Sequence, residues 1–271
     1  MPEHLIASLV VALIGGIVDL DSTAAVQCMI SQPIVAAPLT GLILGSLAGD
    51  VTAGVTLGLM VGVILQLMWI EQLPLGQNVP PDAALASVLS VALGFCASQD
   101  YADYSVSVVC QTVALPISVG LGLLGRGLDM FVRRINTNIN DWVKQRIDEN
   151  DFGAIKTAHL SGLATTFTKA FIFCFLIIWF GVEPIKYFTQ MINSNLHRGF
   201  VAVQGLLPAV GFSVLLSMCL KNKSEIKYVI IGVLIFAFIP VANPWIGIIA
   251  SLIVMTRYYV KNQPKKRGKK Q

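Results

Sequence analysis

Two apolar segments and a proline-containing polar loop follow one another in residues 27–87, which read QCMISQPIVAAPLTGLILGSLAGDVTAGVTLGLMVGVILQLMWIEQLPLGQNVPPDAALAS. A simple membrane anchor needs only Leu, Ile and Val, but this stretch carries amides and carboxylates within or beside its apolar segments. These residues are Gln27, Gln32, Asp50, Gln66, Glu71, Gln77, Asn78 and Asp82. Polar side chains are costly in hydrocarbon unless they face protein, water or a ligand. The stretch therefore predicts broken membrane helices around a binding site for a polar, hydroxyl-rich solute.

The composition is that of a membrane protein. Of 271 residues, 55% are hydrophobic and 13% are charged, and the mean hydropathy is +0.73. Soluble chains average about 25% charged residues. Six of the last eleven residues, 261–271, are Lys or Arg, which indicates the cytoplasmic side of a membrane rather than nucleic-acid binding. The five cysteines form no CxxC pair, so we expect no disulfide framework, no metal site and no cofactor.

The order of apolar segments predicts an all-α, polytopic integral membrane protein. Several segments are shorter than the about 20 residues that a span needs. Short segments interrupted by Gly or Pro indicate broken or re-entrant helices, while tilt and local bilayer thinning are the alternative. The segments are Leu5–Leu20, Ile34–Leu47, Val55–Ile70, Ala83–Ala97, Val106–Leu124, Phe167–Phe180, Phe200–Leu220, Tyr228–Ile239 and Trp245–Met255.

Residues 125–157 differ in character, because charged residues flank one apolar stripe. The stripe has helical spacing and consists of Leu128, Phe131, Ile135, Ile139 and Trp142. We expect a central amphipathic helix in the membrane interface. It would link a first half, 1–124, to a second half, 158–260, within a single membrane domain, 1–271, that ends in a basic cytoplasmic tail, 261–271. The two halves are candidates for pseudo-repeats, although the sequence shows no clear internal repeat.

The motifs QPIVAAPLTGLILG, AGDVTAG, ILQLMWI and PLGQNVPPDAALAS, all between Gln32 and Ser87, are the most specific part of the chain. Together they resemble the IIC subunit of the mannose/fructose/sorbose family of phosphoenolpyruvate-dependent sugar phosphotransferase systems. The chain departs from that pattern at Gln32, where the family usually has Arg. It is also longer between Pro33 and Gln66 by about eight residues, close to two helical turns.

The resemblance implies a multi-pass permease subunit of the bacterial cytoplasmic (inner) membrane. Such a subunit binds a hexose-type sugar outside and carries it inward by an elevator-like movement. It implies a hetero-oligomer with a IID membrane subunit, and phosphoryl transfer by IIA and IIB partner proteins, so the chain itself is not an enzyme. Two alternatives stay open: a non-transporting membrane regulator or scaffold of the phosphotransferase system, and an unrelated ion-coupled secondary transporter.

Four polar residues are the candidate sugar contacts: Gln66, Asp82, Asn78 and Gln27. Asp82 follows Pro80 and Pro81, so we expect it to cap the helix that starts at Ala83 and to keep lone pairs for sugar hydroxyls. Gln66 lies in an apolar helix, where it either binds a neighbouring helix or the sugar. Trp69 either stacks on a sugar ring or anchors the helix at the membrane surface.

Other ionisable residues receive a plainer interpretation. Asp19 and Asp21 close the first apolar segment, and we expect them to end it at the membrane interface. No histidine has a spacing that suggests a phosphoryl relay, so the chemistry is expected to come from a soluble partner.

Overall fold

The structure is a computed structural model that describes residues 2–25, 27–70, 79–98, 109–192, 194–220 and 226–238. Every element in these residues is helical, and five of the helices are long and apolar enough to cross a membrane. The all-α, multi-span prediction is thereby confirmed for the described part of the chain. The chain divides into two compact units, Met1–Leu216 and Ser217–Gln271, and the second contains the apolar helix α9 (Ile226–Phe238).

The elements are, in chain order, α1 (Pro2–Asp19), the π-helix η1 (Leu20–Ala24), α2 (Pro33–Ala48), α3 (Val51–Met68), α4 (Ala83–Ser98), the π-helix η2 (Cys110–Ala114), α6 (Leu115–Asp148), α7 (Gly153–Met191), α8 (Ser194–Cys219) and α9 (Ile226–Phe238). The segments expected over Ile34–Leu47 and Ala83–Ala97 match α2 and α4 closely. The last expected segment, Trp245–Met255, lies outside the described residues.

Helices α2 and α3 form a tight antiparallel hairpin because glycines line their contact. A Cβ atom at Gly58 would lie 2.5 Å from the Ala37 carbonyl oxygen, and one at Gly62 would lie 2.7 Å from that of Pro33. Gly49 makes the turn in the left-handed region, with φ 81°. Asp50 then caps α3 by accepting a hydrogen bond from the Ala53 amide at 2.9 Å.

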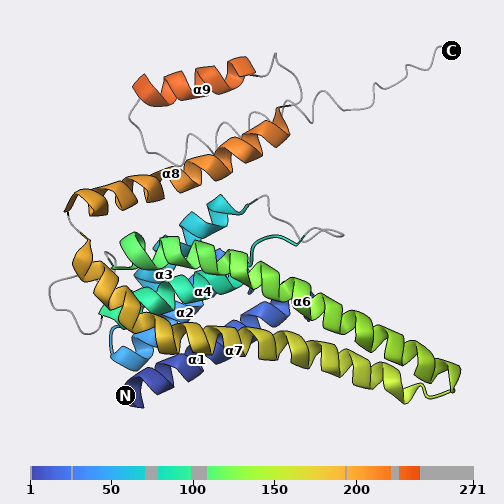
Figure 1. The fold of residues 1–271 in the computed structure, drawn as a ribbon. Coiled ribbons are helices and arrows are strands. Elements are labelled where there is room, and N and C mark those ends of the chain that lie inside the picture. The colour runs from blue at the N-terminus through green and yellow to red at the C-terminus, as the bar shows by residue number, and fades with distance from the viewer. Residues whose placement is uncertain are drawn as a thin grey trace, which may run out of the picture. The chain divides into compact units, whose positions relative to one another are not determined.

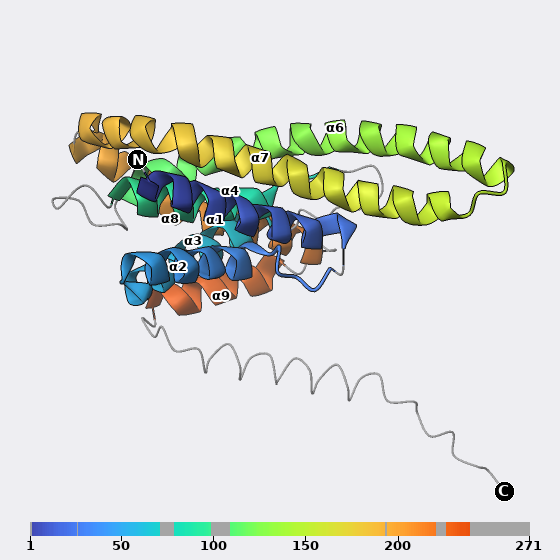
Figure 2. The same ribbon diagram turned by 90° about the horizontal axis from the view of Figure 1, so that it is seen from below.

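Helix α4 is the centre of the first unit. It contacts α1, α2, α3, α6 and α7, and every residue from Ala84 to Ser98 is buried. Helix α1 runs along α7 in both ribbon views (Figures 1 and 2). A helix that is apolar on all sides has no polar face that must contact solvent, so it can be buried completely, which explains why α4 forms the core.

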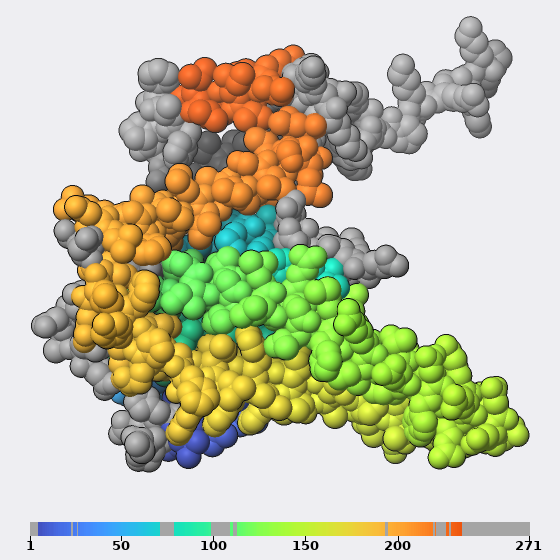
Figure 3. Space-filling model, in the orientation of Figure 1, coloured from blue at the N-terminus to red at the C-terminus, as the bar shows by residue number. Residues whose placement is uncertain are grey.

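Helices α6 and α7 form a long hairpin whose tip lies away from the other helices of the first unit (Figure 1). Their surfaces adjoin along the hairpin in Figure 3. The tip turns at Asn150, which has φ 66°. With 34 residues, α6 is about 51 Å long at ~1.5 Å per residue, which exceeds the ~30 Å hydrocarbon core.

The helix limits expected for the amphipathic segment 125–157 are therefore wrong, because no helix begins at 125 or ends at 157. Residues 125–148 continue α6 without a break, and α7 begins at Gly153. The physical reason is that an amphipathic pattern changes which face is apolar but does not end a helix, and no proline occurs between Pro116 and Asn150. Part of the apolar stripe, including Ile135, faces a groove shared with α7 rather than forming an element of its own.

Candidate functional site

A cavity of about 270 Å³ lies within the first unit, where the ends of several helices meet. This volume is near the lower end of the roughly 300–1,000 Å³ range of small-molecule sites, as suits a ligand of monosaccharide size. The polar lining residues are Ser22, Ser31, Gln32, Gln66, Asp82, Asp129, Arg133, Asn136 and Thr166, and Trp69 and Pro33 are among the apolar ones. Such a mixture of hydroxyl, amide, charged and aromatic groups suits a polyhydroxylated ring.

Gln66 forms one wall of the cavity together with Gln32. The Gln66 amide nitrogen donates to the Gln32 side-chain oxygen at 3.0 Å, and its oxygen accepts from the Ile34 backbone amide at 3.4 Å. Gln66 thus links the last turn of α3 to the start of α2. Both expectations for Gln66 are compatible with this position. Its amide nitrogen can donate a second hydrogen bond and its oxygen can accept a second one, and Gln66 lines the cavity.

Asp82 lies on another wall and caps α4 as the double proline predicted. Its Oδ1 accepts a hydrogen bond from the Leu85 amide at 2.9 Å, and its own amide donates to the Gly122 carbonyl at 2.9 Å. Glycine lets α6 approach this closely, since a Cβ atom at Gly125 would lie 2.8 Å from the Asp82 Cβ. Asp82 is 7% exposed and lines the cavity, so the cap holds a buried carboxylate at its wall.

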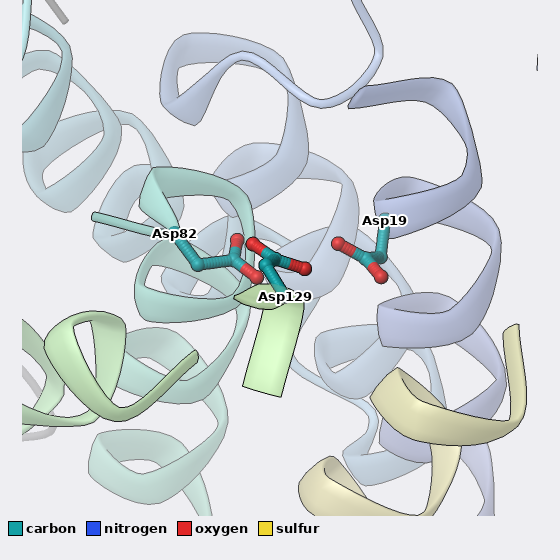
Figure 4. A group of neighbouring side chains, drawn as sticks. All are labelled: Asp19, Asp82 and Asp129. Atoms are coloured by element: carbon teal, nitrogen blue, oxygen red, sulfur yellow. The ribbon is translucent and has the colours of Figure 1, made fainter. Parts of the chain in front are cut away.

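Three carboxylates, one of them that of Asp82, converge from three different segments of the chain (Figure 4). Asp19 comes from the end of α1, Asp82 precedes α4, and Asp129 comes from α6; an oxygen of each lies within 4.8 Å of one of each of the others. The ammonium of Lys169, on α7, lies between them. Its Nζ is 2.7 Å from Asp19 Oδ2, 2.6 Å from Asp129 Oδ1 and 3.7 Å from Asp82 Oδ2.

This cluster corrects the expectation for Asp19, which does not simply end a span at the membrane interface. Asp19 is 2% exposed and paired with Lys169 in the protein interior. The cause is tertiary: α1 packs along α7, and a buried lysine is tolerated only where carboxylates compensate its charge. The available signal was Lys169 itself, because a charged residue within an apolar helix usually faces the protein interior and has a partner there.

Asp21, in η1, has a different role: it binds the backbone of the loop that precedes α2. Its carboxylate accepts hydrogen bonds from the Cys28 amide at 2.6 Å and from the Ser31 amide at 3.0 Å. The Cys28 thiol also donates to Asp21, and this hydrogen bond raises the pKa of Cys28. Asp21 therefore fixes the loop that carries Ser31 and Gln32 to the cavity.

The structure brings together two of the four predicted contacts, Gln66 and Asp82, at one cavity. Gln27 is exposed, has φ 56° and is not among the residues that line this cavity. Asn78 lies outside the described residues. Asp129, Arg133 and Asn136 line the cavity from α6, and none of them is among the predicted contacts, since their position depends on how α6 packs against α4.

The fold defines a multi-pass membrane protein with a polar cavity among its helices. Residues 5–256 match the family model described as "PTS system sorbose-specific iic component". The chain belongs to this family. It is a sugar permease IIC component of a phosphotransferase system of the mannose class, and phosphoryl transfer is carried by partner proteins.

Curated relatives match most of this chain, and solved structures share its fold. The chain is 25% identical to a fructose permease IIC component of Bacillus subtilis, over 87% of this chain and 79% of that one. It is 21% identical to the mannose-specific EIIC component of Escherichia coli, over 86% and 80% of the two chains. A solved membrane protein matches with TM-score 0.71 and 22% identity over 98% of both chains. A chain of the mannose transporter ManYZ in complex with a microcin matches with TM-score 0.52 and 21% identity, also over 98% of both, and supports the fold.

Proposed function

We propose that this chain binds a hexose-type sugar in the cavity between Gln66 and Asp82 and carries it inward by an elevator-like movement. The observation that carries the proposal is the cavity itself, which places an amide wall and a carboxylate wall around a space of about 270 Å³. Sugar hydroxyls are both donors and acceptors, so they can pair with amides and carboxylates together. Trp69 adds an apolar ring surface to the same lining.

The partners follow from the proposed chemistry. A captured sugar is phosphorylated at the cytoplasmic face by a IIB protein that a IIA protein recharges. A IID membrane subunit completes the permease, because IIC components of the mannose family work with a IID subunit. Asn78 and Gln27 stay predicted contacts of secondary rank.

Transport and phosphorylation are tested together in membrane vesicles that contain this chain with and without the partner subunits. Labelled fructose, mannose and sorbose are supplied outside, and phosphoenolpyruvate with the soluble phosphotransferase proteins inside. We expect one or more of these sugars to accumulate as the phosphate only when all partners are present. Sugar binding without uptake would favour the regulator alternative, and uptake that follows an ion gradient instead would favour the secondary transporter.

Gln66→Leu is expected to weaken sugar binding by about 5- to 150-fold. The cavity loses the amide donor and acceptor, so the sugar hydroxyl that pairs with Gln66 is left without a partner. Equilibrium binding of the labelled sugar to the purified complex measures the change. The matched control is Ser46→Ala, which removes an exposed hydroxyl of α2 that bonds only its own helix, at the Leu42 carbonyl. Equal affinity in the two variants would place the sugar elsewhere.

A further inference from the structure

We propose that Lys169 is the positioning residue of the sugar site: its ammonium holds Asp82 and Asp129 in the arrangement that receives the sugar hydroxyls. The inference rests on the proposed function, because it takes the cavity as the sugar site. Lys169 does not line that cavity, although Thr166, one turn earlier on α7, does. Lys169 therefore acts through the two carboxylates and not by touching the sugar.

Geometry shows how one ammonium reaches both carboxylates of the cavity. The Lys169 side chain is 6% exposed and donates a hydrogen bond to Asp129 Oδ1 at 2.6 Å. Asp82 Oδ2 is 3.7 Å from the same nitrogen and has no hydrogen-bond partner in the described part of the chain. Asp129 thus has one oxygen fixed by Lys169, and Asp82 has one fixed by the α4 cap. The second oxygen of Asp129, whose side chain is 31% exposed, can accept from a hydroxyl. Asp82 Oδ2 is enclosed beside the ammonium, so Asp82 would accept through the second lone pair of Oδ1.

Charge explains why the ammonium is needed. Asp82 and Asp129 come from different segments of the chain, and their carboxylate oxygens lie within 4.8 Å of each other. They repel each other, and the repulsion is poorly screened at Asp82, whose side chain is only 4% exposed. Lys169 occupies the space between the three carboxylates, where it serves as a built-in cation. Without it, the two carboxylates would move apart, and the spacing between their accepting oxygens would no longer match neighbouring hydroxyls of one ring.

Asp19 has the complementary role of an anchor for the ammonium. It lies 2.7 Å from Lys169, is 2% exposed and does not line the cavity. Its contact fixes the end of the long and flexible lysine side chain from the α1 side. The order of contacts is therefore Asp19 to Lys169, and Lys169 to the two cavity carboxylates.

The test is equilibrium binding of labelled fructose, mannose and sorbose to the purified permease complex with variants of Lys169. We expect Lys169→Met to raise the Kd at least about tenfold. The phosphorylation rate at saturating sugar should change less than the Kd, because the sugar that does bind is still delivered to the partner. Lys169→Arg keeps the charge and should keep the Kd within about threefold of the parent.

Lys186→Met is the matched control, because Lys186 is also on α7, has a side chain 7% exposed and pairs with a carboxylate, that of Glu183 at 2.9 Å. Lys186 does not line the cavity, so the Kd of the Lys186→Met complex for the sugar should equal that of the parent. If Lys169→Met does not assemble, the double variant Asp19→Asn, Lys169→Met carries the comparison, since it removes one of the three negative charges. Parent-like affinity in an assembled Lys169→Met or double variant overturns the proposal.

A second readout needs no sugar and so separates this inference from the proposed function. Carbodiimide coupling of an amine to Asp82 and Asp129, measured by mass spectrometry, reports whether Lys169 holds the two carboxylates in position and out of reach of the reagent. We expect coupling to rise several-fold in Lys169→Met and to stay unchanged in Lys186→Met. Unchanged coupling in Lys169→Met would show that Lys169 does not position them, whereas a parent complex that binds none of the three sugars would contradict only the proposed function.

Discussion

Replacement of Gly58 by alanine should severely destabilise the first unit, although it adds only one methyl group. A Cβ atom there would lie 2.5 Å from the Ala37 carbonyl oxygen and 2.6 Å from the Pro38 Cα. Both are backbone atoms, so no side chain can turn aside, and α2 and α3 must separate along their length. Overpacking of a core typically costs about 1–3 kcal/mol, and we expect at least the upper end here because the obstacle is backbone. Gly58→Val should prevent accumulation of the permease.

The control for Gly58 is Gly120→Ala on α6, where nothing lies within 4 Å of the added Cβ. Alanine is the better helix former by about 1 kcal/mol, so this variant should be at least as stable as the parent. Thermal unfolding of the purified complex compares the two replacements. A Gly58→Ala protein as stable as Gly120→Ala would show that the glycine contacts do not hold the α2–α3 hairpin together.

The local rules of the sequence were enough to predict the elements around residues 33–98. Pro33 and Gly49 delimit α2, Asp50 caps α3, and the Pro80–Pro81 pair leads to the Asp82 cap of α4. Each of these signals acts over a few residues, so it can be read without knowledge of the fold. The cap predicted for Asp82 is confirmed for the same reason.

Helix lengths after residue 109 were predicted less well. Hydropathy finds the part of a helix that suits hydrocarbon, whereas α7 runs over 39 residues from Gly153 to Met191 and includes polar turns at both ends. The expected segment Phe167–Phe180 is therefore only the middle of that helix. Pro184 does not end it either, although proline usually breaks a helix interior.

The charged part of the site depends on contacts between residues far apart in the sequence. Asp19 and Lys169 are separated by 150 positions, and only the packing of α1 along α7 brings them together. Asp129 cannot be singled out from the sequence either, because residues 125–157 contain many charged residues and only the packing of α6 brings this one to the cluster. A lysine within an apolar stretch of helix indicates that a partner exists, but the sequence alone does not identify it.

Loss of the Asp82 charge should abolish most sugar binding while the protein still folds. Asp82→Asn keeps an oxygen that can accept from the Leu85 amide, so the α4 cap is retained. The variant removes the charge that faces Lys169 at 3.7 Å and makes Asp82 a weaker hydrogen-bond acceptor at the wall of the cavity. Hydrogen bonds to charged groups contribute about 1.5–3 kcal/mol, so affinity should fall by about 10- to 150-fold.

Asp50 offers the control that separates the cap from the site, because it caps α3 in the same way but is exposed and does not line the cavity. Asp50→Ala should cost about 1 kcal/mol of stability through the lost cap, with the sugar Kd unchanged. Asp82→Ala should show both losses, and Asp82→Asn only the loss of affinity. If Asp82→Asn assembles and binds sugar like the parent, Asp82 is a cap alone, and the carboxylate wall of the cavity has no part in recognition.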